Sequence, residues 1–241
     1  MDRDYVTINR DIWDAEAAHW VAMGAQRWAL EAPIWGNWGA AEAALNLLPA
    51  DLAGKDAIEL GCGTGYVSGW MARRGARVTG IDISSGQLAT ARQLAEQHET
   101  AATFIEGNAE ATGLAEASFD FAISEYGAAI WCKPDAWLRE AWRLLRPGGR
   151  LVFLGNHPLV LVCSPLNGAP CDATLHRPYR DMWGGGLDPS RIRSHRGVLQ
   201  SDDVGVDGSV PGHRVPRDEL SRDLHSGPRN RNERQRAGRM G

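Results

Sequence analysis

The residues best suited to chemistry lie in one short segment, "AIELGCGTGYVSGWMARRGARVTGIDIS", residues 57–84. Three glycines alternate there with other residues: Gly61, Gly63 and Gly65. An acid, Glu59, stands just before them, and Asp82 ends the next apolar run. Because glycine has no Cβ, the backbone N–H groups of such a loop can approach a ligand closely. The segment therefore predicts a ligand-binding turn between a strand and a helix.

The glycine spacing excludes two common nucleotide motifs. The pyrophosphate fingerprint GxGxxG needs a glycine where this chain has Tyr66. The sequence also contains no GxxxxGK[ST], the loop that cradles nucleoside triphosphates. The pattern is GxGxG, so the expected ligand is neither a dinucleotide nor a nucleoside triphosphate.

The elements that must hold this loop alternate between strands and helices. Apolar runs predict strands at 57–60, 77–81, 103–105, 119–124 and 151–154, and periodicity predicts helices at 66–74, 85–99 (capped by Ser84) and 135–145. The sequence "RPGG" at 146–149 predicts a turn before the last strand. Apolar strands separated by helices favour an α/β, Rossmann-like doubly wound fold, with a mostly parallel sheet and helices on both faces. Ligands of such sheets bind at the carboxyl ends of the strands.

The first 50 residues precede this alternation of strands and helices. Apolar residues recur at helical spacing from residue 10 to residue 30 and include three tryptophans. This stripe fits two interpretations, plain packing onto the main domain or a lid over a ligand. A Gly/Trp loop follows, and then a short helix is expected at 40–48. We therefore predict three parts: an N-terminal helical cap at 1–50, a ligand-binding domain at 51–183, and a tail at 184–241.

The string "IELGCGTG" resembles the first motif of class I S-adenosylmethionine-dependent methyltransferases. The segments "GNAE", "FDFAISEYG" and "LLRPGGRLVF" follow in that family's order, so the resemblance covers about residues 35–160. It implies that the glycine loop holds the amino-acid end of S-adenosylmethionine. It also implies that Asp82 accepts hydrogen bonds from both ribose hydroxyls, and that Asn108, where the family often has Asp, meets the adenine. The implied cofactor contacts are Glu59, Gly61, Cys62, Gly63, Gly65, Asp82, Ile83, Asn108, Ala109 and Glu125.

A looser resemblance, to actinobacterial small-molecule methyltransferases, extends to "WGNWG", "SEYGAAIW" and "HPLVLVCSP". The methyl group of a sulfonium is already activated, so positioning alone removes much of the barrier to an in-line displacement. A base is needed only where the acceptor must lose a proton. Candidates are Glu125, Tyr126, His157 and His19, of which Glu125 and His157 are the catalytic residues we predict; each also has a purely structural interpretation.

The expected acceptor is a small molecule. Enzymes that methylate amino groups of DNA bases or of glutamine carry Asn/Asp-Pro-Pro-Tyr/Phe after the fourth strand, where this chain has Ser124-Glu125-Tyr126-Gly127. The net charge is −4 and the first 183 residues hold no basic run, which disfavours nucleic acid. Several tryptophans suit an apolar or planar acceptor, although most also fit a core: Trp13, Trp35, Trp38 and Trp131. The alternative function is an inactive or cofactor-binding-only Rossmann-like protein.

Four scattered cysteines without a CxxC pair or a His/Cys cluster predict reduced thiols, no metal site and a cytoplasmic location. The acidic N-terminus "MDRDYVTINRD" has no apolar region of the kind found in signal peptides. No apolar run approaches the roughly 18 residues that span a bilayer, so no membrane partner is expected.

The composition changes near Trp183. All ten Trp, four Tyr and four Phe lie at or before that residue, and residues 184–241 are rich in Arg, Gly, Ser and Asp. Methyltransferases of this class complete their sheet with two more strands after the fifth, and we find no candidate for them beyond Trp183. We therefore predict a sheet without these strands, a fifth strand without a further neighbour, and irregular structure from about residue 184. Two origins stay open for this segment: a natural disordered tail, or a gene read out of frame.

Overall fold

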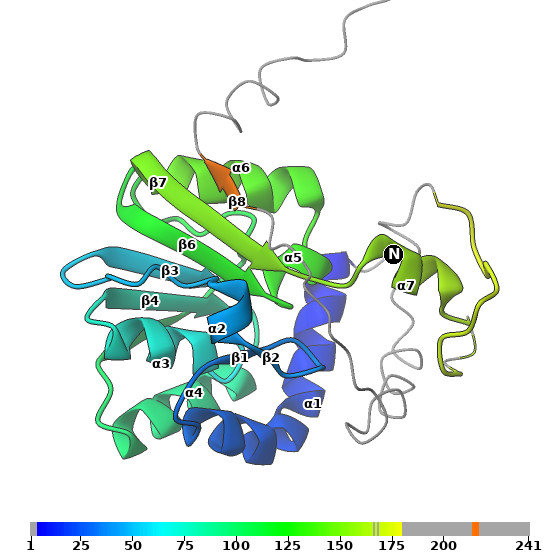
Figure 1. The fold of residues 1–241 in the computed structure, drawn as a ribbon, viewed down its shortest axis with the longest axis horizontal. Helices are drawn as coiled ribbons and strands as arrows, with labels where there is room; N and C mark the ends of the chain where they lie inside the picture. Colours follow the sequence, from blue (N-terminus) through cyan, green and yellow to red (C-terminus); the bar gives the residue numbers. More distant parts are fainter. Residues whose placement is uncertain (1–3, 166, 168, 180–213, 217–241) are drawn as a thin grey trace, which may run out of the picture.

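The computed structural model describes residues 4–165, 167, 169–179 and 214–216 (Figure 1). Its helices are α1 (Tyr5–Trp28), α2 (Glu42–Leu45), α3 (Tyr66–Arg73), α4 (Ser85–Gln97), α5 (Ala128–Trp131), α6 (Pro134–Leu144) and α7 (Pro158–Cys163). Its strands are β1 (Ile34–Trp35), β2 (Ala40–Ala41), β3 (Asp56–Leu60), β4 (Arg77–Asp82), β5 (Ala102–Glu106), β6 (Phe119–Glu125), β7 (Leu145–Leu154) and β8 (Arg214–Pro216).

The main sheet has the order β5-β4-β3-β6-β7-β8, and the first five of these strands are parallel. The chain starts in the middle at β3, runs outward through β4 to β5, and then returns to build β6 and β7 on the other side. Two hydrophobic clusters cover the two faces of the sheet. The predicted Rossmann-like fold with a mostly parallel sheet is thus confirmed. Its topological switch point lies between β3 and β6, where such folds bind their ligands.

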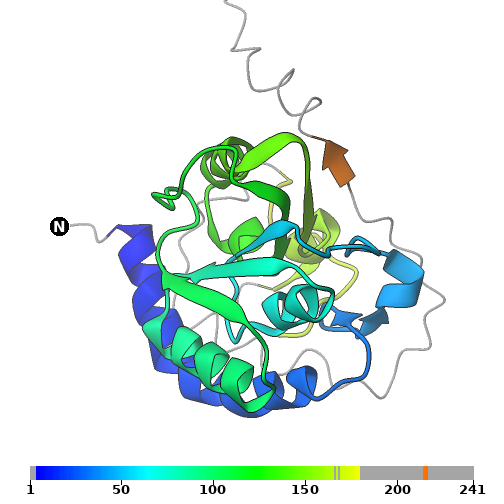
Figure 2. The same ribbon diagram turned by 90° about the vertical axis from the view of Figure 1, so that its left-hand side faces the viewer.

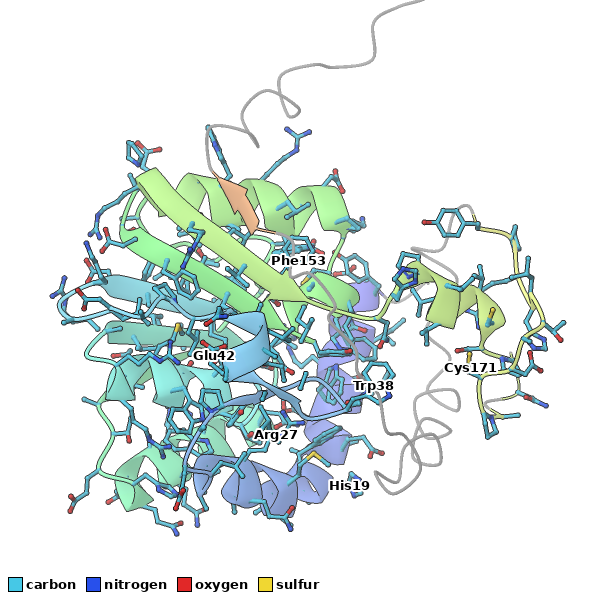
Figure 3. The ribbon with its side chains drawn as sticks, in the orientation of Figure 1. His19, Arg27, Trp38, Glu42, Phe153 and Cys171 are labelled. Carbon is cyan, nitrogen blue, oxygen red and sulfur yellow. The ribbon has the colours of Figure 1, made fainter. Side chains whose placement is uncertain are left out.

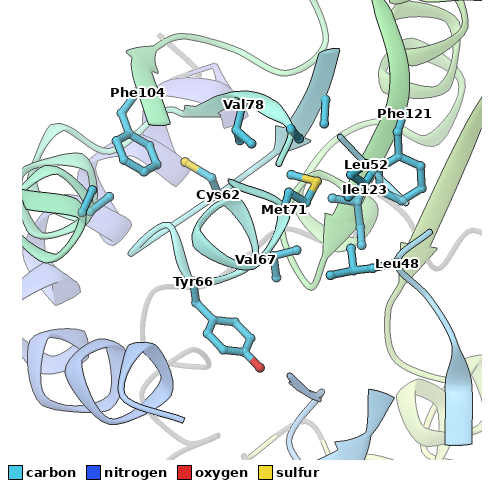
Figure 4. Packing of buried hydrophobic residues seen from close by; sticks show 14 of the residues in the cluster. Leu48, Leu52, Cys62, Tyr66, Val67, Met71, Val78, Phe104, Phe121 and Ile123 are labelled. Carbon is cyan, nitrogen blue, oxygen red and sulfur yellow. The ribbon is translucent and has the colours of Figure 1, made fainter. Parts of the chain in front are cut away.

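The side chains of each strand alternate between the two clusters. Phe121 and Ile123 of β6 pack with α3 and α4, while Ala122 between them packs with α6 on the opposite face. Figure 4 shows the first cluster, in which Met71 of α3 lies close to Leu52 and Ile123. Burial on both faces explains why the strands read as continuous apolar runs. This packing makes the sheet a rigid base for the loops at its carboxyl ends.

Four local predictions need correction. The expected helix at 40–48 is only the four-residue α2, because Ala40 and Ala41 pair with Trp35 and Ile34 in a small antiparallel hairpin, and Asn46 (φ 51°) ends the helix. The expected turn at 146–149 lies inside β7. There the register against β6 shifts between Phe119 and Phe121, and Gly148 has a φ of +80°. Short helices α5 and α7 were not anticipated.

The fourth correction concerns the edge of the sheet. We expected the strand at 151–154 to lack a further neighbour, yet β8 pairs with it antiparallel, from Arg150↔Pro216 to Val152↔Arg214. In this register Val215 lies opposite Leu151. The other expectations for the tail fall on residues outside those described, which include 180–213 and 217–241. Among the described residues no helix is both long and apolar enough to cross a membrane.

Candidate functional site

Backbone hydrogen bonds fix the course of the glycine loop after β3. The N–H groups of Gly61 and Cys62 both donate to the Ile81 carbonyl, at 2.8 and 3.0 Å, and Gly65 N–H donates to the Cys62 carbonyl at 2.8 Å. The φ angles of the three loop glycines are +76°, +50° and +74°, in the region that only glycine adopts easily. The loop therefore lies across the end of β4, as the GxGxG pattern requires.

A second glycine, Gly127, presses against the first glycine of the loop. A Cβ placed on Gly61 would lie 2.5 Å from the Ala128 nitrogen and 2.7 Å from the Gly127 Cα. The loop after β3 and the loop after β6 thus meet backbone to backbone, at the switch point of the sheet. The sequence analysis named Gly127 as part of the segment after the fourth strand but assigned it no role in the site. Its signal was present, since a glycine that follows a strand often marks a close approach of two backbones.

Asp82 ends β4 and faces the glycine loop. One carboxylate oxygen accepts from Gly63 N–H at 2.7 Å, and the other accepts from Ser84 N–H at 2.9 Å. Burial raises the pKa of Asp82, while the hydrogen bonds from backbone N–H groups act in the opposite direction. Each carboxylate oxygen keeps further lone-pair capacity. The arrangement can therefore hold the loop and still accept hydrogen bonds from a diol.

The side chains of Glu59, which precedes the loop, and Cys62, which belongs to it, are both buried. The Glu59 side chain is 2% exposed, and one of its oxygens accepts from the backbone N–H and the hydroxyl of Ser68, at 2.7 and 2.6 Å. Burial raises the pKa of Glu59 to about 8, and it raises the pKa of the Cys62 thiol well above its ordinary value. Glu59 thus anchors the first turn of α3 from inside the protein.

The predicted adenine edge lies one strand further out. Gly107 N–H donates to the Asp82 carbonyl at 2.8 Å, which ties the end of β5 to the end of β4. Asn108 Oδ1 accepts from Glu110 N–H at 2.9 Å and so shapes the turn. Ala109 is 7% exposed, and Ile83 is half-buried beside Asp82. The structure thus brings the implied contacts of β3, β4 and β5 to neighbouring strand ends.

Helix α1 covers these loops. The carboxylate of Asp14 accepts from the Ser84 hydroxyl at 2.6 Å and from Gly86 N–H at 3.1 Å, at the start of α4. Trp28 Nε1 donates to the Thr64 carbonyl inside the glycine loop at 2.9 Å. Figures 1 and 2 both show α1 running alongside α4. Helix α1 therefore packs onto the main domain and contacts both the glycine loop and the start of α4, while its role as a lid over a ligand stays a prediction.

Glu125, at the end of β6, contacts the Gly/Trp loop between β1 and β2. Its carboxylate accepts from Gly36 N–H at 2.7 Å, and Arg27 Nη2 donates to the Gly36 carbonyl at 2.8 Å. Burial raises the pKa of Glu125, and the positive charge of Arg27 opposes that shift. Figure 3 shows Arg27 and Trp38 on the side of the molecule where this loop lies. The result is a half-buried carboxylate beside a loop whose Trp38 is 54% exposed.

Tyr126 follows with a φ of +53°, which is unusual for a residue with a side chain. A Cβ on Gly36 would lie 3.3 Å from the Tyr126 ring, so ring and loop are in contact. Burial raises the pKa of the Tyr126 hydroxyl to about 12, and it therefore stays protonated at neutral pH. Strained residues of this kind concentrate at functional sites.

The two histidines lie elsewhere. His157 caps α7 and is exposed, and its Nδ1 accepts from Leu159 N–H at 3.1 Å. His19 is exposed on the side of α1 that faces away from the sheet (Figure 3). Among the described residues, no hydrogen bond or ring contact links either histidine to Glu125. Within the described part of the chain no group of three or more His, Cys, Asp or Glu side chains is arranged to hold a metal ion.

Comparison with known proteins agrees with this geometry. Residues 58–153 match the model of the methyltransferase domain family. Over 101 residues the chain is 37% identical to the malonyl-[acyl-carrier protein] O-methyltransferase of Serratia marcescens, covering 42% of this chain and 38% of that protein. Over 102 residues it is 40% identical to the ubiquinone/menaquinone biosynthesis C-methyltransferase UbiE of Bradyrhizobium diazoefficiens, covering 40% of each.

Among solved structures, the [4+2]-cyclase SpnF superposes with a TM-score of 0.51 and 25% identity, over 63% of this chain and 60% of that one. The chain spans about two fifths of the length of the curated relatives it matches, and the matched residues are those that build β3 to β7. These residues are similar to the methyltransferase domain family.

Proposed function

We propose that this protein transfers a methyl group from S-adenosylmethionine to a small-molecule acceptor by in-line displacement. The observation that carries the proposal is the meeting of three implied cofactor contacts at adjoining strand ends: the glycine loop after β3, Asp82 on β4 and Asn108 after β5. The match of residues 58–153 to the methyltransferase domain family supports it.

The residues present fit the cofactor. In this proposal Gly61, Cys62, Gly63 and Gly65 hold its amino-acid end, Asp82 its ribose, and Asn108 its adenine between Ile83 and Ala109. Glu59 supports the loop from below through Ser68. When bound, the cofactor supplies a methyl group already activated by its sulfonium. The chain's own work is to bind and orient both molecules and to exclude water beneath α1.

Glu125 is the base candidate that the geometry favours over His157. Its carboxylate is half-buried at the end of β6, two residues before Gly127, the glycine that contacts Gly61 of the glycine loop. A pKa raised by burial suits a carboxylate that takes a proton from an acceptor hydroxyl at neutral pH. His157 remains the second candidate. The two relatives named above are an O- and a C-methyltransferase. They therefore do not indicate which atom of the acceptor receives the methyl group.

The partner we propose is a small molecule rather than nucleic acid, and the cell compartment is the cytoplasm. The four cysteines, all among the described residues, form no disulfide bond, as is typical of a reducing compartment. The narrower actinobacterial subgroup and the division into residues 1–50, 51–183 and 184–241 stay predictions. Since α1 hydrogen-bonds to the loops after β3 and β4, we propose that residues 1–50 act as one unit with the main domain.

A second candidate function is cofactor binding without methyl transfer. One observation favours it: a protein with this fold is a [4+2]-cyclase. The fold and the glycine loop alone therefore do not require methyl transfer.

The two candidates are separated by incubating the full chain with S-adenosylmethionine labelled on its methyl group and with small-molecule extracts. Label that appears in a small-molecule product, together with calorimetric binding of S-adenosylhomocysteine, supports the first. Binding without any transfer supports the second. Label found only in protein or nucleic acid would overturn the proposed acceptor class.

A further inference from the structure

Tyr66 occupies the position where a dinucleotide-binding loop has its third glycine, and the proposed cofactor contacts give its side chain no role. The residue is 6% exposed and begins α3 directly after Gly65. Its hydroxyl accepts from the Ile34 N–H at 2.6 Å and donates to the Ile34 carbonyl at 2.7 Å. One side chain thus satisfies both backbone groups of a residue 32 positions earlier in the chain. It ties the β1–β2 hairpin to the end of the glycine loop.

The loop of this hairpin is held against the end of β6 by three contacts. Gly36 N–H donates to the Glu125 carboxylate at 2.7 Å, and Arg27 donates to the Gly36 carbonyl at 2.8 Å. A Cβ on Gly36 would lie 3.3 Å from the Tyr126 ring, and the φ angle of Gly36 is +63°. A side chain at this position would therefore be both strained and crowded. These contacts leave Gly36 little freedom to move while the hairpin stays in place.

The hairpin in turn is anchored just before Gly36. Ile34, which Tyr66 binds, precedes Gly36 by two residues. Between them Trp35 is 1% exposed, and its Nε1 donates to the Glu42 carboxylate at 2.9 Å. Trp35 attaches the hairpin to α2, whereas Tyr66 attaches it to the glycine loop and the start of α3. The contact through Tyr66 is therefore the one that relates the position of Gly36 to the cofactor side of the site.

We propose that Tyr66 is a positioning residue for Glu125: through Ile34 it holds the β1–β2 loop so that the Gly36 N–H faces the Glu125 carboxylate. The inference rests on the proposed function, in which Glu125 is the base. The same side chain then keeps the base at a fixed distance from the loop that holds the cofactor. This role explains why the position carries a tyrosine, since a phenylalanine would fill the same space without binding Ile34.

The test is the titration of Glu125 in Tyr66→Phe, which removes the hydroxyl and keeps the ring. The charged and titratable groups that face Glu125 are Arg27 on α1, Glu59 on β3, Tyr66 on α3 and the neighbouring Tyr126. Tyr66 is neutral at physiological pH, because burial raises its pKa above the ordinary value of 10.0. The substitution therefore changes no charge around Glu125, and a changed titration reports a changed hydrogen bond.

The hydrogen bond from Gly36 N–H lowers the pKa of Glu125, against the effect of burial. When the hairpin loosens and this bond is lost, the pKa of Glu125 should rise by about one pH unit. Carbon-13 NMR of the full chain without ligand measures the titration, and the Glu125 signal is identified by its loss in Glu125→Gln. Calorimetry should give Tyr66→Phe an affinity for S-adenosylhomocysteine within about threefold of wild type, because backbone bonds to Ile81 fix the glycine loop.

Tyr5→Phe is the matched control. It also removes a tyrosine hydroxyl that bonds across the fold, since the Tyr5 hydroxyl donates to the Glu110 carboxylate near the other end of α1. It should leave the titration of Glu125 as in wild type. An equal rise in both variants would show that general loosening of the fold moves the titration, and it would overturn the role of Tyr66.

Two further results would overturn the inference. One is an unchanged Glu125 titration in Tyr66→Phe that is folded by circular dichroism, which would mean that the Trp35 contact is sufficient to hold the hairpin. The other needs no variant and decides the question if Tyr66→Phe does not fold. In wild-type hydrogen exchange the N–H groups of Ile34 and Gly36 should be protected to a similar degree, so rapid exchange at Ile34 beside a protected Gly36 would contradict the proposal. A wild-type chain that binds no S-adenosylhomocysteine would instead refute the proposed cofactor site, because the Glu125 titration is measured without ligand.

Discussion

The two sides of the candidate site are built differently. On the cofactor side, the hydrogen bond from Gly63 to Asp82 joins residues 19 positions apart within one βαβ unit. On the acceptor side, the bond from Gly36 to Glu125 joins residues 89 apart, and where α1 meets α5 the bond from Asn9 to Trp131 joins residues 122 apart. The first set forms whenever β3, α3 and β4 form. The second set requires that α1 and the β1–β2 loop dock on a sheet already assembled.

This difference separates residues that should control the stability and cofactor affinity of the domain from residues that should control closure of the site. The cofactor side uses backbone groups and tolerates few side chains, so changes there should cost stability or cofactor affinity directly. The acceptor side uses single side-chain contacts on a helix and a loop. Changes there should leave the domain folded and should alter how the site is closed and charged. The predictions that follow test this division, from the largest expected effect to the smallest.

The largest effect is expected for Gly61→Ala. The new Cβ would meet the Ala128 nitrogen at 2.5 Å, and φ is +76°. Left-handed strain and overpacking together should lower the free energy of unfolding by about 2–5 kcal/mol, as measured by urea denaturation. Gly63→Ala is the matched control, because its Cβ would meet nothing closer than Gln87 Oε1 at 3.9 Å and the cost should be about 1 kcal/mol. Equal losses would show that the Gly61–Gly127 contact is not tight.

The second effect concerns Glu59 and pH. Burial raises the pKa of Glu59 from 4.5 to about 8, so the folded state binds more protons than the unfolded state within that range. Stability contributed by the neutral acid is therefore present at pH 4.5 and falls as the pH rises toward 8. Glu59→Gln should remove this dependence and be more stable than wild type at pH 8, by on the order of 2–4 kcal/mol.

Urea denaturation across pH 4.5–8 measures this effect. Glu140 is an internal contrast with the opposite sign, because its pKa is lowered to about 2 despite the desolvation that raises it, chiefly by hydrogen bonds from Arg143 and Thr112. Its contribution should be lost as the pH falls from 4.5 toward 2. If Glu59→Gln and wild type keep parallel stability curves, Glu59 is already ionised in the folded protein.

The third effect is on the cofactor. Asp82→Ala removes the proposed acceptor of the ribose hydroxyls and should weaken S-adenosylhomocysteine binding by roughly 1–3 kcal/mol in calorimetry. Asp120→Ala is the control, since Asp120 pairs with Arg146 at 2.8 Å and follows Phe119 at the opposite, amino end of β6. Unchanged affinity in Asp82→Ala would refute the ribose assignment.

The smallest effect belongs to the acceptor side. Arg27→Gln removes a positive charge that opposes the raised pKa of Glu125, so that pKa should rise further. The change in stability should stay within about 1 kcal/mol, because the two contacts of Arg27, with the Gly36 carbonyl and the Tyr66 ring, are only half-buried. Carbon-13 NMR of the glutamate carboxyl groups follows the titration, and Arg27→Lys should restore most of the wild-type value. A titration unaffected by Arg27→Gln would show that the charge is screened from Glu125.

The local sequence predicted most of the backbone geometry around the glycine loop. Asp82 and the glycines could be read from the chain because each follows directly from a strand end, a left-handed backbone or the start of a helix. Ser84 was predicted as a cap and does accept from Gln87 N–H at 3.1 Å. The turn predicted at 146–149 was wrong, because these residues lie inside β7, and that placement depends on the register against β6.

What the sequence determined by itself is the alternation of elements and the loop at their switch point, because both depend on interactions between residues close along the chain. Only the tertiary structure decided that Gly127 closes on Gly61, that α1 lies across the loops, and that Arg27 reaches Gly36 beside Glu125. It also decided that residues 214–216 pair with β7. These contacts join segments far apart in the chain, and no periodicity or spacing records them, because their energy comes from packing that exists only after the sheet has formed.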